Sequence, residues 1–138
     1  MRSTLLALAA LGLAVSVPAA ARQTVAERGE AKLAKMLEGR VAGEPVKCIS
    51  AFNGSNIQVI DETALVYRTG DTVYVARPTY VARPTDPKML GRNDVLVTER
   101  IGSQLCANDS MRTIDRHDGF FSGVVFLSDF VPYTKADG

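Results

Sequence analysis

The densest cluster of chemically reactive side chains is Asp115-Arg116-His117-Asp118-Gly119. His117 is the only histidine of the chain, so histidine-based general acid–base catalysis would have to use it, with Asp115 or Asp118 orienting the ring. The same residues are typical of a solvated turn between two strands, with Asp118-Gly119 as the turn itself. The composition of the cluster favours the turn, and catalysis is the alternative.

Metal and cofactor sites find little support in the sequence. The cluster around His117 offers one imidazole and two carboxylates, whereas structural zinc sites usually have four ligands that include more His or Cys. Its aspartates also lack the alternation of a calcium-binding loop. No glycine-rich motif that cradles a phosphate is present. We therefore predict no metal and no cofactor.

Cys48 and Cys106 are the only cysteines of the chain. In an exported protein an even pair predicts one disulfide. Its closed loop of about 58 residues would stabilise the fold by about 4 kcal/mol in the chain-entropy model. The alternative is a redox-active or nucleophilic thiol, but the Cys-x-x-Cys spacing of redox motifs is absent.

A hexapeptide is repeated in tandem: Tyr74-Val75-Ala76-Arg77-Pro78-Thr79 recurs without a mismatch at residues 80–85. Two copies are too few for a solenoid, and the proline near the end of each copy argues against a second continuous strand. We predict that residues 80–85 lengthen a surface loop and can be deleted at little cost in stability. A second interpretation is a stiff loop that offers Arg77, Tyr80 and Arg83 to a partner.

The first 21 residues have the pattern of a secretory signal peptide. Arg2 supplies a positive start, an apolar run follows from Leu5 to Val17, and Pro18-Ala19-Ala20-Ala21 has the small side chains of a cleavage site. The run is shorter than the roughly 20 strongly apolar residues that span a bilayer. We predict removal of residues 1–21, a single α+β domain at 22–138 without a transmembrane anchor, and a periplasmic or secreted location.

Hydrophobic periodicity predicts one helix followed by strands. Thr24-Val25-Ala26-Glu27 has the form of a capping box, and apolar residues recur at helical spacing over residues 25–38. From Pro45 onward the chain is divided into short runs rich in β-branched and aromatic residues. The predicted strands are Val46–Ser50, Ile57–Ile60, Ala64–Tyr67, Thr72–Arg77, Val95–Glu99, Met111–Asp115 and Phe120–Leu127. The predicted fold class is α+β, with one N-terminal amphipathic helix packed on a curved antiparallel sheet that could be barrel-like.

Several short motifs follow one another along the mature chain. They are Leu37-x-Gly39-Arg40, Gly43-x-Pro45-Val46-x-Cys48-Ile49, Val59-Ile60-Asp61, Val73-Tyr74-Val75, Asp94-Val95-Leu96-Val97, Leu105-Cys106 with Asp109, and Gly123-x-Val125-Phe126-Leu127-x-Asp129-Phe130-Val131-Pro132-Tyr133. In these motifs the chain resembles a family of small exported proteobacterial proteins of unknown function, commonest in sphingomonad-type bacteria. The motifs are turns, strand cores and the cysteine pair, so the resemblance implies no catalytic residues. The second hexapeptide copy departs from the family's pattern, which implies an insertion at residues 80–85.

The charge balance limits the classes of partner. The chain has 16 Lys and Arg residues and 15 Asp and Glu residues, and the basic ones are scattered, which argues against a nucleic-acid or anionic-membrane surface. The leading hypothesis is a non-enzymatic periplasmic domain that binds a protein partner or a small ligand, or supports the envelope. The alternative is a small hydrolase or metal-dependent enzyme that uses His117 with Asp115 and Asp118. An enzyme requires His117 in a pocket beside a carboxylate, whereas a binding domain predicts an exposed turn and an apolar groove elsewhere, or no groove.

Overall fold

The computed structural model describes residues 22–51, 56–82, 90–91, 93–99 and 102–136, and of residues 80–82 only the main chain. The predicted signal peptide, residues 1–21, lies outside these ranges. Within them one helix, α1 (Val25–Met36), precedes a series of strands. The strands are β1 (Arg40–Ala42), β2 (Cys48–Ser50), β3 (Ile57–Ile60), β4 (Ala64–Thr69), β5 (Thr72–Ala76), β6 (Pro78–Ala82), β7 (Asp94–Thr98), β8 (Gln104–Cys106), β9 (Met111–Asp115), β10 (Phe121–Leu127) and β11 (Val131–Lys135).

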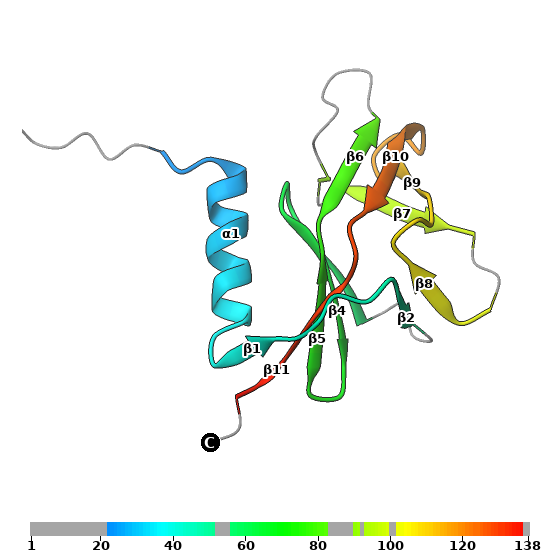
Figure 1. The fold of residues 1–138 in the computed structure, drawn as a ribbon. Helices are drawn as coiled ribbons and strands as arrows, with labels where there is room; N and C mark the ends of the chain where they lie inside the picture. Colours follow the sequence, from blue (N-terminus) through cyan, green and yellow to red (C-terminus); the bar gives the residue numbers. More distant parts are fainter. Residues whose placement is uncertain (1–21, 52–55, 83–89, 92, 100–101, 137–138) are drawn as a thin grey trace, which may run out of the picture.

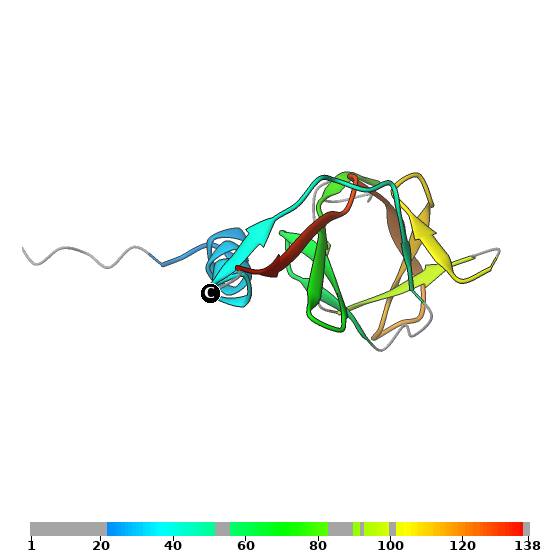
Figure 2. The same ribbon diagram turned by 60° about the horizontal axis from the view of Figure 1, so that its bottom comes forward.

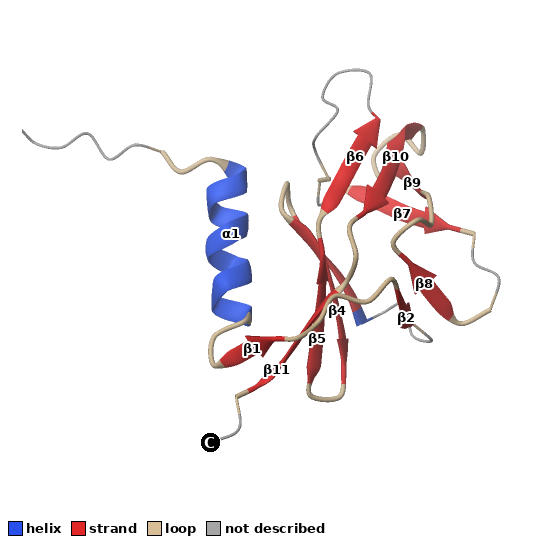
Figure 3. Cartoon of the chain, viewed as in Figure 1, coloured by secondary structure: helices blue, strands red, loops and turns tan. Residues whose placement is uncertain are grey.

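The strands form three antiparallel groups (Figure 1). A five-stranded sheet has the order β1-β11-β5-β4-β3, a four-stranded sheet has the order β6-β10-β9-β7, and β2 pairs with β8. Figure 3 shows how far strands outweigh helix, and Figure 2 shows α1 standing to one side of the strands. The two larger sheets end at β3 and at β7, so each has an edge strand there.

The fold differs from the predicted α+β class in three respects. Of the residues that the structure describes, 51% are in strands and 13% are helical, because short strands form where the pattern predicted loops. The sheets do not close into a barrel. The helix lies at Val25–Met36, inside the chain and not at its N-terminus. Its capping box is present as predicted: the Glu27 N–H donates to Thr24 Oγ1 at 3.2 Å, and the Thr24 N–H donates to Glu27 Oε2 at 2.6 Å.

The first four residues of β4, in the five-stranded sheet, are buried on both faces, which explains the continuous apolar run Ala64-Leu65-Val66-Tyr67. On β4, Leu65 and Tyr67 join the core between the sheets, while Ala64 and Val66 join a second core under α1. Leu33 of α1 is 3% exposed and packs in this second core. The helix therefore covers the outer face of this sheet.

Two chain segments pass from one large sheet to the other and form a shared corner. β5 continues into β6 through Arg77, and β10 continues into β11 through residues 128–130. The Ser128 N–H donates to the Arg77 carbonyl at 2.8 Å, and the Arg77 N–H donates to Ser128 Oγ at 2.9 Å. Because β5 pairs with β11 and β6 pairs with β10, these two bonds hold the bend where both strands change sheets.

The predicted loop at residues 80–85 is wrong in its first half. Residues 80–82 belong to β6, which pairs with β10 through Phe126↔Tyr80, Val125↔Val81 and Val124↔Ala82. Pro78 does not prevent this pairing because it is the first residue of the strand, where a missing N–H is tolerated. Residues 83–85 lie outside the described ranges. The repeat therefore supplies a strand of the second sheet.

Gly29 allows the closest approach of α1 to the sheet. A Cβ at this position would meet Thr63 Oγ1 at 2.0 Å and the Asp61 carbonyl oxygen at 2.7 Å, both in the turn between β3 and β4. We expect Gly29→Ala to lower the free energy of unfolding by roughly 1–3 kcal/mol, because the helix must move outward. Thermal or urea denaturation measures this loss.

The matched control removes a Cβ from the exposed side of the same helix. Ala31→Gly should cost about 1 kcal/mol through helix propensity alone. Helix propensity alone would make Gly29→Ala raise the free energy of unfolding, because alanine is favoured over glycine in a helix. A stabilised Gly29→Ala protein would contradict the close contact.

Arg77 also ties the corner to the helix. Its guanidinium donates to both carboxylate oxygens of Glu30, at 2.5 and 3.0 Å. This hydrogen bonding lowers the pKa of Glu30 from its ordinary value of 4.5. A carboxyl whose pKa is lower in the folded state adds stability above its ordinary pKa, and the stability is lost as the pH falls through the folded value.

We expect Glu30→Gln to lower the free energy of unfolding at pH 7 by at most about 1 kcal/mol, because both side chains are about half exposed. The difference from the parent should shrink on going from pH 7 to pH 3 in thermal denaturation. Glu38→Gln, at an exposed position after the helix, is the matched control and should have little effect at either pH. A Glu30→Gln effect that persists undiminished at pH 3 would rule out the ion pair as its cause.

Candidate functional site

The cluster around His117 forms the turn between β9 and β10. His117 is exposed, and the Asp115 carboxylate accepts the His117 main-chain N–H at 2.7 Å. The Asp118 carboxylate accepts the Phe120 N–H at 2.9 Å, and Gly119 has a positive φ of 74°. Both aspartates thus bind the main chain of the turn. This geometry gives no support to the hydrolase alternative.

Of the predicted partner-contact residues Arg77, Tyr80 and Arg83, the structure describes the side chain of Arg77 and the main chain of Tyr80. The Arg77 guanidinium binds Glu30 within the molecule. The main chain of Tyr80 is paired with β10, and Arg83 lies outside the described residues. A partner contact at these three positions therefore stays a prediction.

A cleft of about 310 Å³ lies between the two edge strands β3 and β7, and we call it the seam cleft. Three residues of the core between the sheets line it: Leu65, Leu105 and Met111, each at most 2% exposed. Ile57 and Val59 line it from β3 and are only partly buried. The seam cleft is thus an apolar opening that leads onto the core.

On the other side the seam cleft touches the edge of β7. It is lined by Asp94, Val95 and Leu96, which are consecutive residues, and by Thr98. Successive side chains of a strand point to opposite faces of its sheet. A cavity lined by three residues in a row therefore wraps around the edge of the strand, where the main-chain groups that face away from β9 lie.

Two polar side chains that line the seam cleft, Asp94 and Thr98, differ in their hydrogen bonding. Asp94 is 8% exposed, and its carboxylate accepts from the Ser122 hydroxyl at 3.0 Å and from the Gly91 N–H at 2.9 Å. Ser122 lies at a register shift in the β9–β10 pairing, and such a bulge re-aims a side chain, here towards Asp94. Thr98 Oγ1 is different: it is buried and has no hydrogen-bond partner in the described part of the chain.

Arg116 supplies the one cation that lines the seam cleft among the described residues. Its main-chain N–H donates to the Asn93 carbonyl at 3.0 Å, which places the turn after β9 beside the start of β7. The side chain is exposed and makes no hydrogen bond or ion pair to the residues that the structure describes. A negative group bound in the seam cleft could therefore reach this guanidinium.

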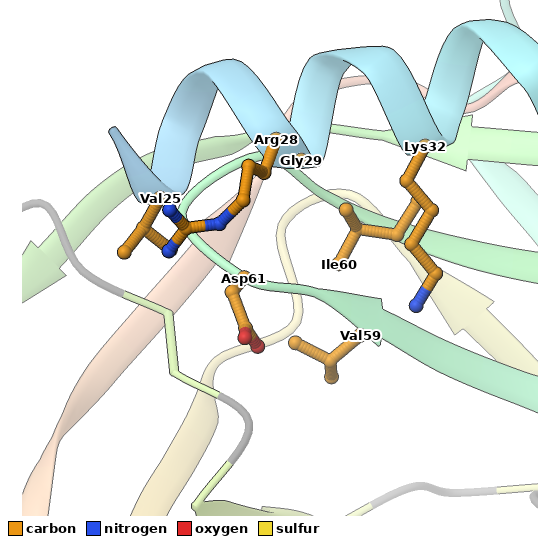
Figure 4. A pocket seen from close by; sticks show the side chains of 7 residues that line it. All are labelled: Val25, Arg28, Gly29, Lys32, Val59, Ile60 and Asp61. Atoms are coloured by element: carbon orange, nitrogen blue, oxygen red, sulfur yellow. The ribbon is translucent and has the colours of Figure 1, made fainter. Parts of the chain in front are cut away.

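A second cleft, of about 340 Å³, lies between α1 and β3 (Figure 4). Its charged residues have both signs: Arg28 and Lys32 from the helix and Asp61 from the turn after β3. The Arg28 guanidinium donates to the Gln23 carbonyl at 2.7 Å. This cleft flanks Gly29, where the helix approaches the sheet most closely, and its mixed charges favour no single ligand.

The predicted disulfide is present. Cys48 and Cys106 are opposite each other in the β2–β8 pair, with their Cα atoms 4.0 Å apart and a sequence separation of 58. Ile49 and Leu105, the next pair in the ladder, are buried, so the bond fastens β2 and β8 at the core. Leu105 also lines the seam cleft, which the disulfide therefore supports.

Neither side-chain clusters nor similarity to known proteins assigns a function to this chain. Among the described residues no group of three or more His, Cys, Asp or Glu is placed to hold a metal ion. No helix in the same part of the chain has the length and apolar character needed to cross a membrane. Comparison with protein-family models, with curated proteins and with solved structures finds no match to this chain.

Proposed function

We propose that this protein is an exported, non-enzymatic binding domain whose ligand occupies the seam cleft. The observation that carries the proposal is the apolar opening onto Leu65, Leu105 and Met111 beside a buried hydroxyl, Thr98 Oγ1, that has no hydrogen-bond partner among the described residues. Binding sites are typically apolar concavities with a few convergent polar groups. A buried polar atom without a partner calls for a water, an ion or a ligand. A ligand with an apolar body and one hydrogen-bonding group fits both features.

The apolar, anionic probe anilinonaphthalene sulfonate tests this site. We expect saturable binding to the folded domain by calorimetry, with amide shifts at β3 and β7 in NMR spectra. Leu96→Phe adds volume inside the cleft and should weaken binding about tenfold, the equivalent of about 1.4 kcal/mol. The matched control is Val41→Phe on β1, where the side chain is 56% exposed and distant in the sheet order. Equal affinity of both variants, or no saturable binding, would contradict the proposal.

The export part of the proposal rests on the apolar run at residues 5–17 and on the disulfide, since disulfides persist in oxidising compartments. We expect the full chain, expressed in a Gram-negative host, to appear in the periplasmic fraction. Its mass should be that of a product whose first residue is Arg22 or a close neighbour. A product that keeps residues 1–21 and stays in the cytoplasm would contradict export.

A further inference from the structure

We propose that the ligand of the seam cleft is an extended peptide segment of another protein, added as a strand to the edge of β3. This inference rests on the proposed function, because it names the ligand class of the same site. Strand addition derives affinity from main-chain hydrogen bonds and specificity from pockets for alternate side chains. β3 offers an edge for the main chain and a cleft on each side for the side chains.

The edge of β3 is suited to pairing. β3 is the last strand of the five-stranded sheet and pairs only with β4 among the described strands. Beyond this ladder, no main-chain hydrogen bond reaches Ile57, Gln58 or Val59 in the part of the chain that the structure describes. Sheet edges are often protected by lysine, proline or a bulge. These three residues include no lysine or proline, and the β3–β4 register runs without a shift.

A cleft lies on each face of this edge. Ile57 and Val59 line the seam cleft. The cleft between α1 and β3, which we call the helix cleft, is lined on the sheet side by Val59, Ile60 and Asp61. Figure 4 shows Ile60 between the strand and the helix, with Val59 and Asp61 on the side away from the helix. Because three successive residues with alternating side chains line it, the helix cleft wraps around the edge of β3.

The two clefts determine the side-chain pattern of the added segment. Successive side chains of a strand point to opposite faces. On the side of the seam cleft they would lie over Leu65, Leu105 and Met111, so apolar side chains fit there. On the side of the helix cleft they would lie beside charged residues of both signs, so polar side chains fit there. The two linings thus favour a segment in which apolar and polar residues alternate.

Thr98 adds a preference at one position of the segment. Its Oγ1 is buried and has no hydrogen-bond partner among the described residues, and Thr98 lines the seam cleft on the β7 side. A threonine among the apolar residues of the ligand carries a methyl group and a hydroxyl, so it would supply the missing hydrogen bond. We therefore expect threonine to be preferred over valine at one of the apolar positions.

The length of the added strand is limited by β3 itself, which has four residues. In the turn that follows β3, the Glu62 N–H donates to the Leu90 carbonyl at 2.9 Å. The chain at Leu90 therefore lies beside this end of the edge, and an added strand would stop there. A hexapeptide is thus long enough to cover the whole edge.

The first test uses pools of acetylated and amidated hexapeptides, which have no terminal charges. One pool alternates as Φ-Gln-Φ-Lys-Φ-Glu, where Φ is Val, Leu or Phe, and the other has the same composition with the three apolar residues in a row. We expect the alternating pool to displace anilinonaphthalene sulfonate and to shift the amides of Ile57–Val59 in NMR spectra. It should bind about tenfold more tightly than the second pool, the equivalent of about 1.4 kcal/mol. Equal binding of the two pools would overturn the inference.

Two further pools test the main-chain pairing. Both have the alternating pattern, and one is N-methylated at its apolar residues and the other at its polar residues. The N–H groups of successive residues in a strand point to opposite edges, so each pool lacks the donors of one edge only. We expect one of these pools to lose binding and the other to keep it. Loss of binding in both pools, or in neither, would overturn strand addition to β3.

Variants connect binding to the named residues. Val59→Lys places a charge on the edge strand, a natural device against added strands, and should abolish peptide binding. The matched control is Val97→Lys on β7, which is 39% exposed and does not line the seam cleft, and it should keep binding. Peptide binding that survives Val59→Lys would contradict pairing at β3.

Thr98→Val keeps the size of the side chain and tests the same site should Val59→Lys fail to fold. The parent should prefer threonine over valine at one apolar position by about fivefold, as the net gain of one hydrogen bond gives. Thr98→Val should abolish this preference. A preference that is absent from the parent, or that persists in Thr98→Val, would contradict the placement of the segment in the seam cleft.

The outcomes also separate this inference from the proposed function. If decanoate displaces anilinonaphthalene sulfonate but no peptide pool does, the ligand is a small amphipathic molecule and the inference is wrong. If the sulfonate probe itself does not bind, the seam cleft is not a binding site and both proposals fail.

Discussion

Deletion of residues 80–85 is expected to destabilise the protein by roughly 3–5 kcal/mol, because three cross-strand positions and their ladder bonds are lost. The repeat makes the consequence easy to follow in the sequence. After the deletion, Pro78-Thr79 would be followed by Asp86-Pro87-Lys88 in place of Tyr80-Val81-Ala82. A second proline and two charges would then stand opposite β10. Urea denaturation of the purified domain measures the loss.

The control keeps the chain length. Replacing residues 83–85 by Gly-Ser-Gly leaves all of β6 as the structure has it, so this variant should unfold close to the parent. If the deletion variant itself melts within a few degrees of the parent, β6 contributes nothing to stability and residues 80–85 act as a loop after all.

Removal of the disulfide has the second large effect. Cys48→Ala together with Cys106→Ala opens a loop with a sequence separation of 58. The chain-entropy model gives a loss of about 4 kcal/mol, which corresponds to a fall in melting temperature of roughly 15 °C for a domain of this size. Calorimetry of the parent with and without a thiol reductant should reproduce the same fall.

The double alanine variant also serves as the control for the reductant, since its melting temperature should not respond to thiol. Because β2 and β8 pair with no further strand among the described residues, their loosening should also weaken probe binding at the seam cleft through Leu105. A parent protein that melts at the same temperature when reduced would show that the bond contributes little to stability.

Local patterns predicted the elements better than they predicted the architecture. The capping box at Thr24 and Glu27 and the strand Ile57–Ile60 follow from short-range spacing, and both are present. β1 and β8 are missing from the prediction because three residues are too few for a periodicity. β6 was not predicted because it begins at Pro78, and proline argues against a strand in the sequence pattern. Whether a sheet closes depends on which strands meet at a distance, and no local pattern carries that information.

The candidate site was the harder part for the same reason. Reactive side chains in sequence drew attention to His117, whereas the seam cleft is made of ordinary apolar strand residues such as Val59 and Leu96. Nothing in the sequence distinguishes Thr98; only the structure shows that its hydroxyl is buried and has no hydrogen-bond partner in the described part of the chain. Arg116 belonged to the predicted cluster, but its role beside the start of β7 depends on the turn that follows β9. The sequence contains one indication of this part of the site. The run Val95-Leu96-Val97 has no charged side chain of the kind that discourages further strand pairing at a sheet edge.

The width of the seam cleft depends on the angle of the bend at Arg77 and Ser128, because the edge strands lie at a distance from this bend. The edge strands β3 and β7 each lie two strands away from the bent pair, which at about 4.8 Å per strand is an arm of about 10 Å. A change of about 10° in the bend would therefore move an edge by about 2 Å, which is a large part of a strand spacing. The two hydrogen bonds between Arg77 and Ser128 lie at the bend itself, and neither residue lines the seam cleft. The gap between β3 and β7 thus depends on a contact between two residues that do not line the seam cleft.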